Sequence, residues 1–357
     1  MHVFAGTETL SESSSRAAWN LLIPTLVVLI VVALRPLEKT FITSLTDDRF
    51  ADTAEGRWVG LDNYTTLLAF RFDAVSCTRD EAGACVVNAD GSIAFPRVRD
   101  VVDESYLSLR FREAGDFTIG ETKIVFSARD QNFFRAVGNT LVFTFFSVVL
   151  ELVLGLFVAM VINSKFSGRG LMRAAMLVPW AIPTVVSARL WSVMLRPDSS
   201  GVINQFLLST GFIATPQAWL ANTSLQLPAI IAIDVWKTTP FMALVLLAGL
   251  QVIPSDLYEA ADVDGASKVR QFFRLTLPLL RPAIAVALVF RTLDAVRVFD
   301  VFNVLFSDAR QSMATYNYTT LVNGQQAGYA SAVGVVIFLI ILIFTVLYVR
   351  ILGVNAE

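Results

Sequence analysis

Six apolar stretches constrain the fold of this chain more than any other feature of its sequence. In chain order they cover about residues 19–37, 133–163, 170–195, 225–252, 282–306 and 328–352. At a helical rise of about 1.5 Å per residue, each stretch can cross roughly 30 Å of hydrocarbon, some of them tilted. Pro179 and Pro183 predict a kink or a break in the third stretch. The sequence therefore predicts an all-α integral membrane protein with six transmembrane helices.

The composition and the reactive side chains exclude several classes of function. Hydrophobic residues make up 55% of the chain and charged residues 16%, with a mean hydropathy of +0.62, which argues against a soluble enzyme. A formal net charge of -2 provides no basic surface for nucleic acid. One histidine, His2, and two cysteines cannot form a metal cluster or a Cys/His nucleophile pair. Because no G-x-x-x-x-G-K-S/T loop is present, any ATP must bind to another chain.

The first apolar stretch is predicted to be an uncleaved membrane anchor. Residues 1–18 are short, polar and Ser-rich, and Arg16 and Arg35 flank the apolar run. A signal peptide has the same general plan, but no small-residue cleavage site follows here. We therefore interpret residues 1–18 as an N-terminal segment and residues 19–37 as transmembrane helix 1.

Residues 38–132 are predicted to form an insertion outside the bilayer, partly of β structure. The composition is polar, residues 89–92 carry a turn signal, and short apolar runs such as 123–126 are typical of strands. Cys77 and Cys85 both lie in this insertion. A disulfide between them is expected if this side of the membrane is oxidising, and two free thiols are the alternative.

Basic residues in the short loops predict the orientation of the helices. Lysine and arginine gather after the second stretch, in the loop 254–281 and at the end of the last stretch. The short loops on the other side hold little more than Arg196 and Arg310. Both termini, including the tail 353–357, and the loop 254–281 are therefore predicted to be cytoplasmic. The insertion 38–132 is then external, which agrees with the expected disulfide.

The loop 254–281 is polar and patterned, although it lies between two apolar stretches. Asp256 and Glu259 are placed in the early turns of a short helix, where carboxylates favour the positive end of the helix dipole. Gly265 is predicted to end this helix, as glycine often does at a helix C-terminus.

Two alanines and a second short helix complete the expected form of this loop. Ala260 and Ala261 make one face small and smooth, which suits docking into a groove on another protein. The second helix is predicted from about residue 267 to residue 275, and it is expected to stop near Pro278.

The loop carries a motif at fixed spacing: Glu259-Ala260-Ala261, three residues, Gly265, nine residues, then Leu275-x-Leu277-Pro278. It resembles the EAA-x3-G-x9-I-x-L-P signature of permease subunits of binding-protein-dependent ABC importers, with Leu in place of Ile at 275. The resemblance covers about residues 133–352. A weaker match lies at 58–64. Residues that look like the carbohydrate-uptake branch, and within it the maltose-type first permease, are found at 139–141, 179–183, 236–242, 290–295 and 297–300. Ser307-Asp308-Ala309-Arg310 departs from the Gly-Gly-Pro element that many relatives carry there.

The resemblance implies a core permease domain of the type I importer kind at residues 133–352. In this family the docking loop, or coupling helix, inserts into a cleft on a cytoplasmic ATPase, and Glu259, Ala260, Ala261 and Gly265 would form that surface here. The implied partners are a second permease, two copies of the ATPase that carry ATP and Mg, an external solute-binding protein, a sugar and membrane lipid. The implied location is a bacterial or archaeal plasma membrane.

Two of the apolar stretches carry several ionisable residues each at membrane depth. An ionisable group there costs about 2.5 to 3.5 kcal/mol on insertion scales, so it normally faces a partner or an aqueous cavity. The residues are Asp234, Lys237, Arg291, Asp294, Arg297 and Asp300. One interpretation is a polar sugar cavity flanked by aromatic residues such as Trp236 and Phe241. The other is a structural ladder of salt bridges, and it stays open for Arg297 and Asp300.

The resemblance also implies sugar contacts, because several positions match those at which the maltose-type relative contacts its sugar. They are Asp234, Lys237, Thr238, Phe241, Arg291 and Asp294. Ala295 and Val298 match contact positions but are small and apolar, which implies a different sugar or pose. Glu151, the lone acid in the second stretch, is given no role beyond an interhelical hydrogen bond.

The resulting prediction is a non-catalytic transmembrane subunit of an ATP-driven importer of a di- or oligosaccharide, forming half of the translocation pathway. The alternative is a secondary transporter driven by an ion gradient, with Asp294 or Asp234 as its ion site. A membrane-embedded enzyme would need a catalytic constellation, and we find none in the sequence. The missing phosphate loop, together with a docking loop, favours the importer.

Overall fold

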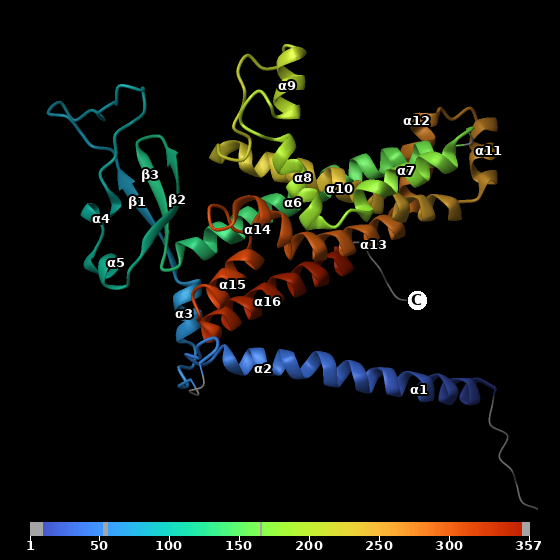
Figure 1. Cartoon of the computed structure of the whole chain (residues 1–357), viewed down its shortest axis with the longest axis horizontal. Coiled ribbons are helices and arrows are strands. Elements are labelled where there is room, and N and C mark those ends of the chain that lie inside the picture. The colour runs from blue at the N-terminus through green and yellow to red at the C-terminus, as the bar shows by residue number, and fades with distance from the viewer. Residues whose placement is uncertain (1–9, 53–55, 165, 352–357) are drawn as a thin grey trace, which may run out of the picture. The chain divides into compact units, whose positions relative to one another are not determined.

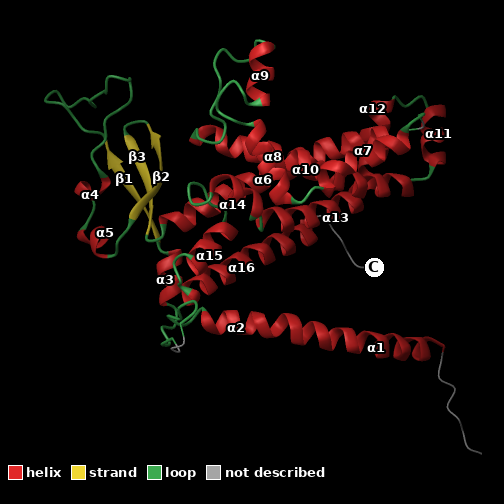
Figure 2. Cartoon of the chain, in the orientation of Figure 1, coloured by secondary structure: helices red, strands yellow, loops and turns green. Residues whose placement is uncertain are grey.

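The computed structural model describes residues 10–52, 56–164 and 166–351. Helices make up most of these residues, and three strands form one small sheet (Figures 1 and 2). The predicted tail 353–357 and residues 1–9 of the predicted N-terminal segment lie outside the described part of the chain. The chain divides into two compact units, Met1–Thr65 with Thr320–Val335 and Thr66–Thr319 with Val336–Glu357.

The elements follow one another along the chain with two π-helical segments between α-helices. In order they are α1 (Leu10–Leu29), a π-helical segment (Ile30–Leu34), α2 (Arg35–Thr43), α3 (Asp62–Leu68), β1 (Phe70–Ser76), α4 (Val98–Val101), α5 (Glu104–Ser108), β2 (Arg112–Ile119), β3 (Thr122–Ala128), α6 (Gln131–Asn163), α7 (Arg169–Ala181), α8 (Thr184–Met194), α9 (Val202–Ser209), α10 (Thr223–Val252), α11 (Ser255–Val263), α12 (Lys268–Gln271), a second π-helical segment (Phe272–Thr276), α13 (Leu277–Val296), α14 (Asp300–Phe306), α15 (Met313–Val322) and α16 (Ala327–Ile351).

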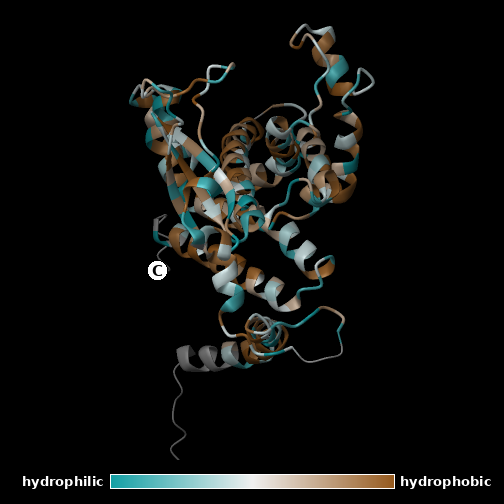
Figure 3. Ribbon diagram, turned by 90° about the vertical axis from the view of Figure 1, so that its left-hand side faces the viewer, coloured by the Kyte–Doolittle hydropathy of each residue, from teal (hydrophilic) through white to brown (hydrophobic). Residues whose placement is uncertain are grey.

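Five helices of the described chain are long and apolar enough to cross a membrane, and the pair α7 and α8 forms a sixth crossing if it is one span. Hydrophobic residues predominate along the helices, whereas the strands mix hydrophilic and hydrophobic residues (Figure 3). The fold is therefore the mostly helical membrane fold predicted from the apolar stretches.

The first unit contains one long helix built from α1, a π-helical segment and α2. Its large apolar side chains between Trp19 and Leu37 are exposed, as suits a helix in contact with lipid. After α2 the chain pairs with the start of α16: the Gly328 N–H donates to the Asp48 carbonyl at 3.0 Å. A Cβ at Gly328 would lie 2.0 Å from the Thr46 carbonyl oxygen, so only glycine fits this contact.

In the second unit, the insertion contains an antiparallel sheet in the order β1-β3-β2, as its strand signals predicted. Val75 and Val125 point to one face of the sheet and are buried there with Val98 and Tyr106 from the α4 and α5 segments. Beyond β1 the structure joins Cys77 and Cys85 in a disulfide, with their Cα atoms 5.6 Å apart.

The transmembrane core of the second unit consists of α6, α10 and α13. Small residues allow these helices to approach closely, as is typical of helix packing in membranes. A Cβ added at Gly155 in α6 would lie 2.7 Å from Met242 Cγ in α10. A Cβ added at Gly249 in α10 would lie 2.4 Å from Ala283 Cβ in α13. The core therefore leaves little space along the lines where these helices meet.

The third predicted stretch is interrupted, as its prolines predicted. α7 ends at Ala181, α8 begins at Thr184, and the two axes differ by 90°. Pro183 provides the extended residue before α8, because its ring fixes φ and its nitrogen has no hydrogen to donate. Pro179 remains inside α7.

The fifth predicted stretch, 282–306, is divided differently in the structure. α12, the π-helical segment and α13 form one continuous helix, so the expected stop near Pro278 is wrong. The π-helical segment lies just before Pro278, and such a segment changes the hydrogen-bond register so that a proline can be accommodated. At the other end α13 stops at Val296, and the chain turns at Arg297 before α14 begins at Asp300.

Candidate functional site

A cavity of about 230 Å³ lies where the two interrupted helices meet α10. It is lined by Trp180, Thr184, Asp234, Lys237, Thr238, Arg291, Asp294, Arg297, Val298, Phe299, Asp300 and Val301. The break between α7 and α8 and the turn between α13 and α14 both contribute to its wall. Interrupted helices inside a membrane are found at transport sites, because irregular backbone is tolerated there only when it is buried or faces a cavity.

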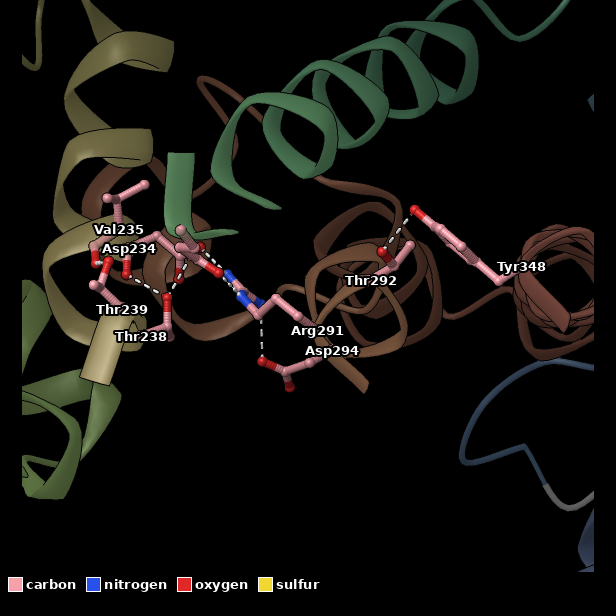
Figure 4. Close-up of polar contacts among 9 residues, drawn as sticks. Asp234, Val235, Thr238, Thr239, Arg291, Thr292, Asp294 and Tyr348 are labelled. Atoms are coloured by element: carbon pink, nitrogen blue, oxygen red, sulfur yellow. Dashed lines mark hydrogen bonds and ion pairs between the residues drawn. The ribbon is translucent and has the colours of Figure 1, made fainter. Parts of the chain in front are cut away.

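Arg291 of α13 is the centre of an ion cluster beside this cavity (Figure 4). Its Nε and Nη2 atoms donate to the two carboxylate oxygens of Glu151, and Nη2 also donates to Asp234. Nη1 donates to Asp294 Oδ2 at 3.0 Å. The Arg291 side chain is only 3% exposed, and a charge so buried needs partners. All three guanidinium nitrogens are thus directed to protein carboxylates.

The cluster joins the three core helices. Glu151 comes from α6, Asp234 and Thr238 come from α10, and Arg291 and Asp294 come from α13. The Thr238 hydroxyl lies 2.5 Å from Glu151 Oε1 and 2.7 Å from the Asp234 carbonyl oxygen. Five polar side chains from three helices are therefore positioned by one network of charged hydrogen bonds.

Glu151 is the member of this cluster for which only an interhelical hydrogen bond was expected, and the structure shows such bonds to α10 and α13. Its side chain is fully buried and does not line the cavity, yet it accepts hydrogen bonds from Arg291 and Thr238, which do. Its position as the only acid in a long apolar stretch singled it out in the sequence, and the feature that the structure adds is its pairing with Arg291. An isolated carboxylate at membrane depth requires a cationic partner, and Arg291 is that partner.

The aromatic residues around the cavity are arranged differently from the prediction. Trp180 lines the cavity, and Phe241 does not line it but stacks on Trp180, with ring centroids 6.3 Å apart and planes 17° apart. Lys237 Nζ donates to the Trp180 carbonyl at 3.3 Å. Trp236 was expected beside the sugar, but it is 40% exposed and contacts Trp191 edge to face on the far side of α10. Phe241 thus supports the cavity wall from behind.

Arg297 and Asp300 do not extend the ion cluster along one helix face. Because α13 ends at Val296, Arg297 lies in the turn and its Nε donates to the Leu293 carbonyl at 3.0 Å. Asp300 begins α14. The described residues contain no ion pair for either side chain, so the predicted ladder of salt bridges ends at Asp294. Both residues line the cavity instead.

The predicted coupling loop forms α11 and the start of the long helix that leads into α13. α11 ends in a Schellman motif: the Gly265 N–H donates to the Asp262 carbonyl at 3.0 Å, and the Ala266 N–H donates to the Ala261 carbonyl at 2.9 Å. Gly265 has φ +73°, a left-handed conformation that glycine adopts without a Cβ clash. The predicted helix end at Gly265 is confirmed.

The surface of this loop is exposed and partly apolar. Glu259 and Ala260 are exposed, and Ala261 is half-buried. Val263 is 88% exposed and Val269 is 68% exposed, although neither belongs to an apolar stretch that lipid would cover. Lys268 and Gln271 bind Asp262 and hold the two sides of the loop together, and these hydrogen bonds lower the pKa of the Asp262 carboxyl. The loop therefore presents a fixed surface with uncovered apolar side chains.

The turn after α14 closes a second, polar cavity of about 570 Å³ at the other end of the core. Arg310 donates to Gln226 Oε1 at 2.8 Å, to Asn139 Oδ1 at 3.0 Å and to the Thr223 carbonyl at 2.9 Å. Arg310 thus fixes the turn that replaces the Gly-Gly-Pro element to the first turns of α10 and to α6.

Comparison with known proteins gives a family match over more than half of the chain. The family model described as "Binding-protein-dependent transport system inner membrane component" matches residues 151–353. The trehalose/maltose transport system permease protein MalF of Thermococcus litoralis is 44% identical over 233 residues, which are 64% of this chain and 76% of that protein. The trehalose transport system permease protein SugA of Mycobacterium tuberculosis is 38% identical over 229 residues, 64% of this chain and 72% of that protein.

A solved structure shares the fold over nearly the whole chain. A bacterial ABC transporter involved in the import of the acidic polysaccharide alginate contains a chain with a TM-score of 0.66 and 22% identity. The match covers 98% of this chain and 100% of that chain. It includes the insertion and the transmembrane core, so both are features of this fold.

Proposed function

Because this chain belongs to the family of binding-protein-dependent transport system inner membrane components, we propose that it is the transmembrane subunit of an ATP-driven sugar importer. It carries a di- or oligosaccharide through a pathway that it shares with a second permease. Trehalose and maltose, the sugars in the name of the relative from Thermococcus litoralis, are the first candidates. The observation that carries the proposal is the polar cavity at the two helix breaks.

The cavity offers the groups that a sugar needs. Lys237 and Arg297 provide donors, Asp294 and Asp300 provide acceptors, and these two cations and two carboxylates balance in charge. Hydroxyl groups of a neutral sugar can exchange their water for such charged hydrogen bonds. The Trp180 ring gives the sugar an apolar face to lie against. Of the contacts implied by resemblance, Lys237 and Asp294 bind the sugar directly, whereas Arg291, Asp234 and Thr238 form the wall behind them.

The volume of the cavity supports a site completed by another subunit. Pockets that enclose a ligand usually measure about 300–1,000 Å³, and this cavity of about 230 Å³ falls below that range. A facing permease adds the other wall, and the cavity widens when the pathway opens towards the solute-binding protein.

The loop 254–281 couples this cavity to ATP hydrolysis on the partner chains. Glu259, Ala260, Ala261 and Gly265 form its docking surface, and the exposed Val263 is covered by the ATPase. Two ATPase copies bind ATP and Mg, while this chain is not a catalyst. The loop and both termini lie in the cytoplasm of a bacterium or archaeon, and the insertion with its disulfide lies outside.

Reconstitution tests the function as a whole. The chain is assembled in proteoliposomes with its second permease, ATPase and solute-binding protein, and uptake of labelled maltose and trehalose is measured. We expect uptake that requires ATP on the ATPase side and the binding protein on the other. An ion gradient without ATP is the control. Uptake driven by that gradient alone would refute the importer and restore the secondary transporter.

A further inference from the structure

Glu151 contacts two residues of the cavity wall without reaching the cavity itself. It lies in the middle of α6, is fully buried, and is absent from the cavity lining. Its Oε1 atom accepts from Thr238 Oγ1 at 2.5 Å and from Arg291 Nη2 at 2.9 Å, and its Oε2 atom accepts from Arg291 Nε. One carboxylate thus sets the orientation of two cavity residues.

The geometry of these hydrogen bonds determines which part of Arg291 faces the sugar. A carboxylate that binds Nε and Nη2 together holds the guanidinium plane in one orientation, since the two donors have fixed directions. Nη1 is then the nitrogen left for Asp294, at 3.0 Å. The Asp294 side chain is 72% exposed at the cavity wall. Glu151 thereby fixes the orientation of Arg291, and Arg291 in turn holds Asp294, a carboxylate that a sugar can reach.

Helix packing alone does not require this arrangement. The contact between α6 and α10 already contains Ala159, Ile162, Met242 and Leu246, which are all fully buried. The cluster also places three carboxylates around a single arginine. One carboxylate would suffice to pair the buried charge, so the additional acids point to a role in arranging the site.

We propose that Glu151 is a positioning residue of the sugar site, acting through Arg291 and Thr238 to fix Asp294. The proposal rests on the sugar importer function proposed above. Without the Glu151 charge, the Arg291 guanidinium turns towards Asp234 and Asp294, and the Thr238 hydroxyl loses its charged acceptor and keeps the Asp234 carbonyl. The sugar then meets a displaced carboxylate, while the docking loop is unchanged.

The test uses equilibrium binding of labelled maltose and trehalose to the purified permease–ATPase complex without the solute-binding protein. Glu151→Gln keeps the shape of the side chain and removes its charge. We expect it to weaken sugar binding about tenfold, because hydrogen bonds to charged groups are the strong ones in such a network. Glu151→Asp keeps the charge on a shorter side chain, and we expect an intermediate loss.

Thr144→Val provides the matched control on the same helix. Thr144 is also buried in α6, and its hydroxyl has no hydrogen-bond partner among the described residues. We expect this variant to bind sugar as the unmodified complex does.

Each outcome decides the proposal. Weakened binding in Glu151→Gln, with unchanged co-purification of the ATPase, supports it. Unchanged sugar affinity in the assembled Glu151→Gln complex overturns it and leaves Glu151 as a clamp between helices. If Glu151→Gln does not assemble, Glu151→Asp decides, and wild-type affinity in that variant overturns the proposal. Failure of the unmodified complex to bind or transport either sugar counts against the proposed function instead.

Discussion

Replacing Gly265 by alanine tests the coupling role that we propose for the loop 254–281, because it changes the backbone conformation of a turn without adding a side-chain clash. Gly265 has φ +73° in the Schellman motif that ends α11, and no other atom lies within 4 Å of a Cβ added there. The substitution therefore creates no clash with neighbouring residues. Its whole effect comes from the left-handed backbone conformation, which a residue with a Cβ adopts at a cost of roughly 1–2 kcal/mol.

That cost is large for a short exposed helix. A change of one or two kcal/mol shifts a local equilibrium by a factor of roughly 5 to 30. The open state, in which the hydrogen bond from the Ala266 N–H to the Ala261 carbonyl is broken, should become more populated by this factor. We expect the protection of the Ala266 amide against hydrogen exchange to fall to the same extent. Sugar-stimulated ATP hydrolysis and uptake should fall with it, at unchanged expression.

Two further variants make the test specific. Gly265→Asn should fall between glycine and alanine, because asparagine tolerates the left-handed conformation better than alanine. Gly168→Ala is the matched control: Gly168 has φ +91°, no atom lies within 4 Å of its added Cβ, and it precedes α7 outside the coupling loop. We expect Gly168→Ala to lose local protection but to keep ATP hydrolysis coupled to sugar. Normal coupled uptake by Gly265→Ala, despite lost amide protection, would refute the coupling role of this turn.

Two other predictions concern the core and the insertion. Gly249→Ala should destabilise the protein by about 1–3 kcal/mol, seen as a lower Tm in detergent, because its Cβ would lie 2.4 Å from that of Ala283. Gly138→Ala, with nothing within 4 Å of its Cβ, is the control, and an equal Tm for both variants would contradict the close approach. Replacing Cys77 and Cys85 by serine should cost about 2–3 kcal/mol of local stability and accelerate proteolysis between residues 77 and 94. Unchanged cleavage rates would mean that the disulfide does not stabilise this segment.

Patterns that lie within one element could be predicted from the sequence. Apolar stretches longer than the hydrocarbon is thick require helices, and Pro183 favours the interruption that the structure shows between α7 and α8. Gly265 ends a helix because the left-handed backbone conformation at this position favours glycine. The spacing of Asp234, Lys237 and Thr238 on α10 placed them together in the structure as well.

Features that depend on contacts between distant elements could not be predicted in the same way. Glu151 and Arg291 are far apart in the sequence and meet only because α6 and α13 pack together. The turn at Arg297 has no strong sequence signal, so a regular helix was expected to continue through it. Trp236 and Lys237 are neighbours in sequence, yet one helical step of about 100° turns the tryptophan away from the cavity.

The continuous helix from Lys268 to Val296 connects the loop 254–281 directly to the ion cluster at Arg291. Between Gln271 and Arg291 it rises by about 30 Å, so a tilt of about 5° at the docking loop displaces the arginine by roughly 2–3 Å. A displacement of that size is nearly a full hydrogen-bond length, and it would separate Arg291 from both of its buried carboxylates. Because breaking such ion pairs inside a membrane is costly, we expect α6 and α10 to move together with α13. A tilt imposed on the loop 254–281 would therefore reach three helices through one arginine.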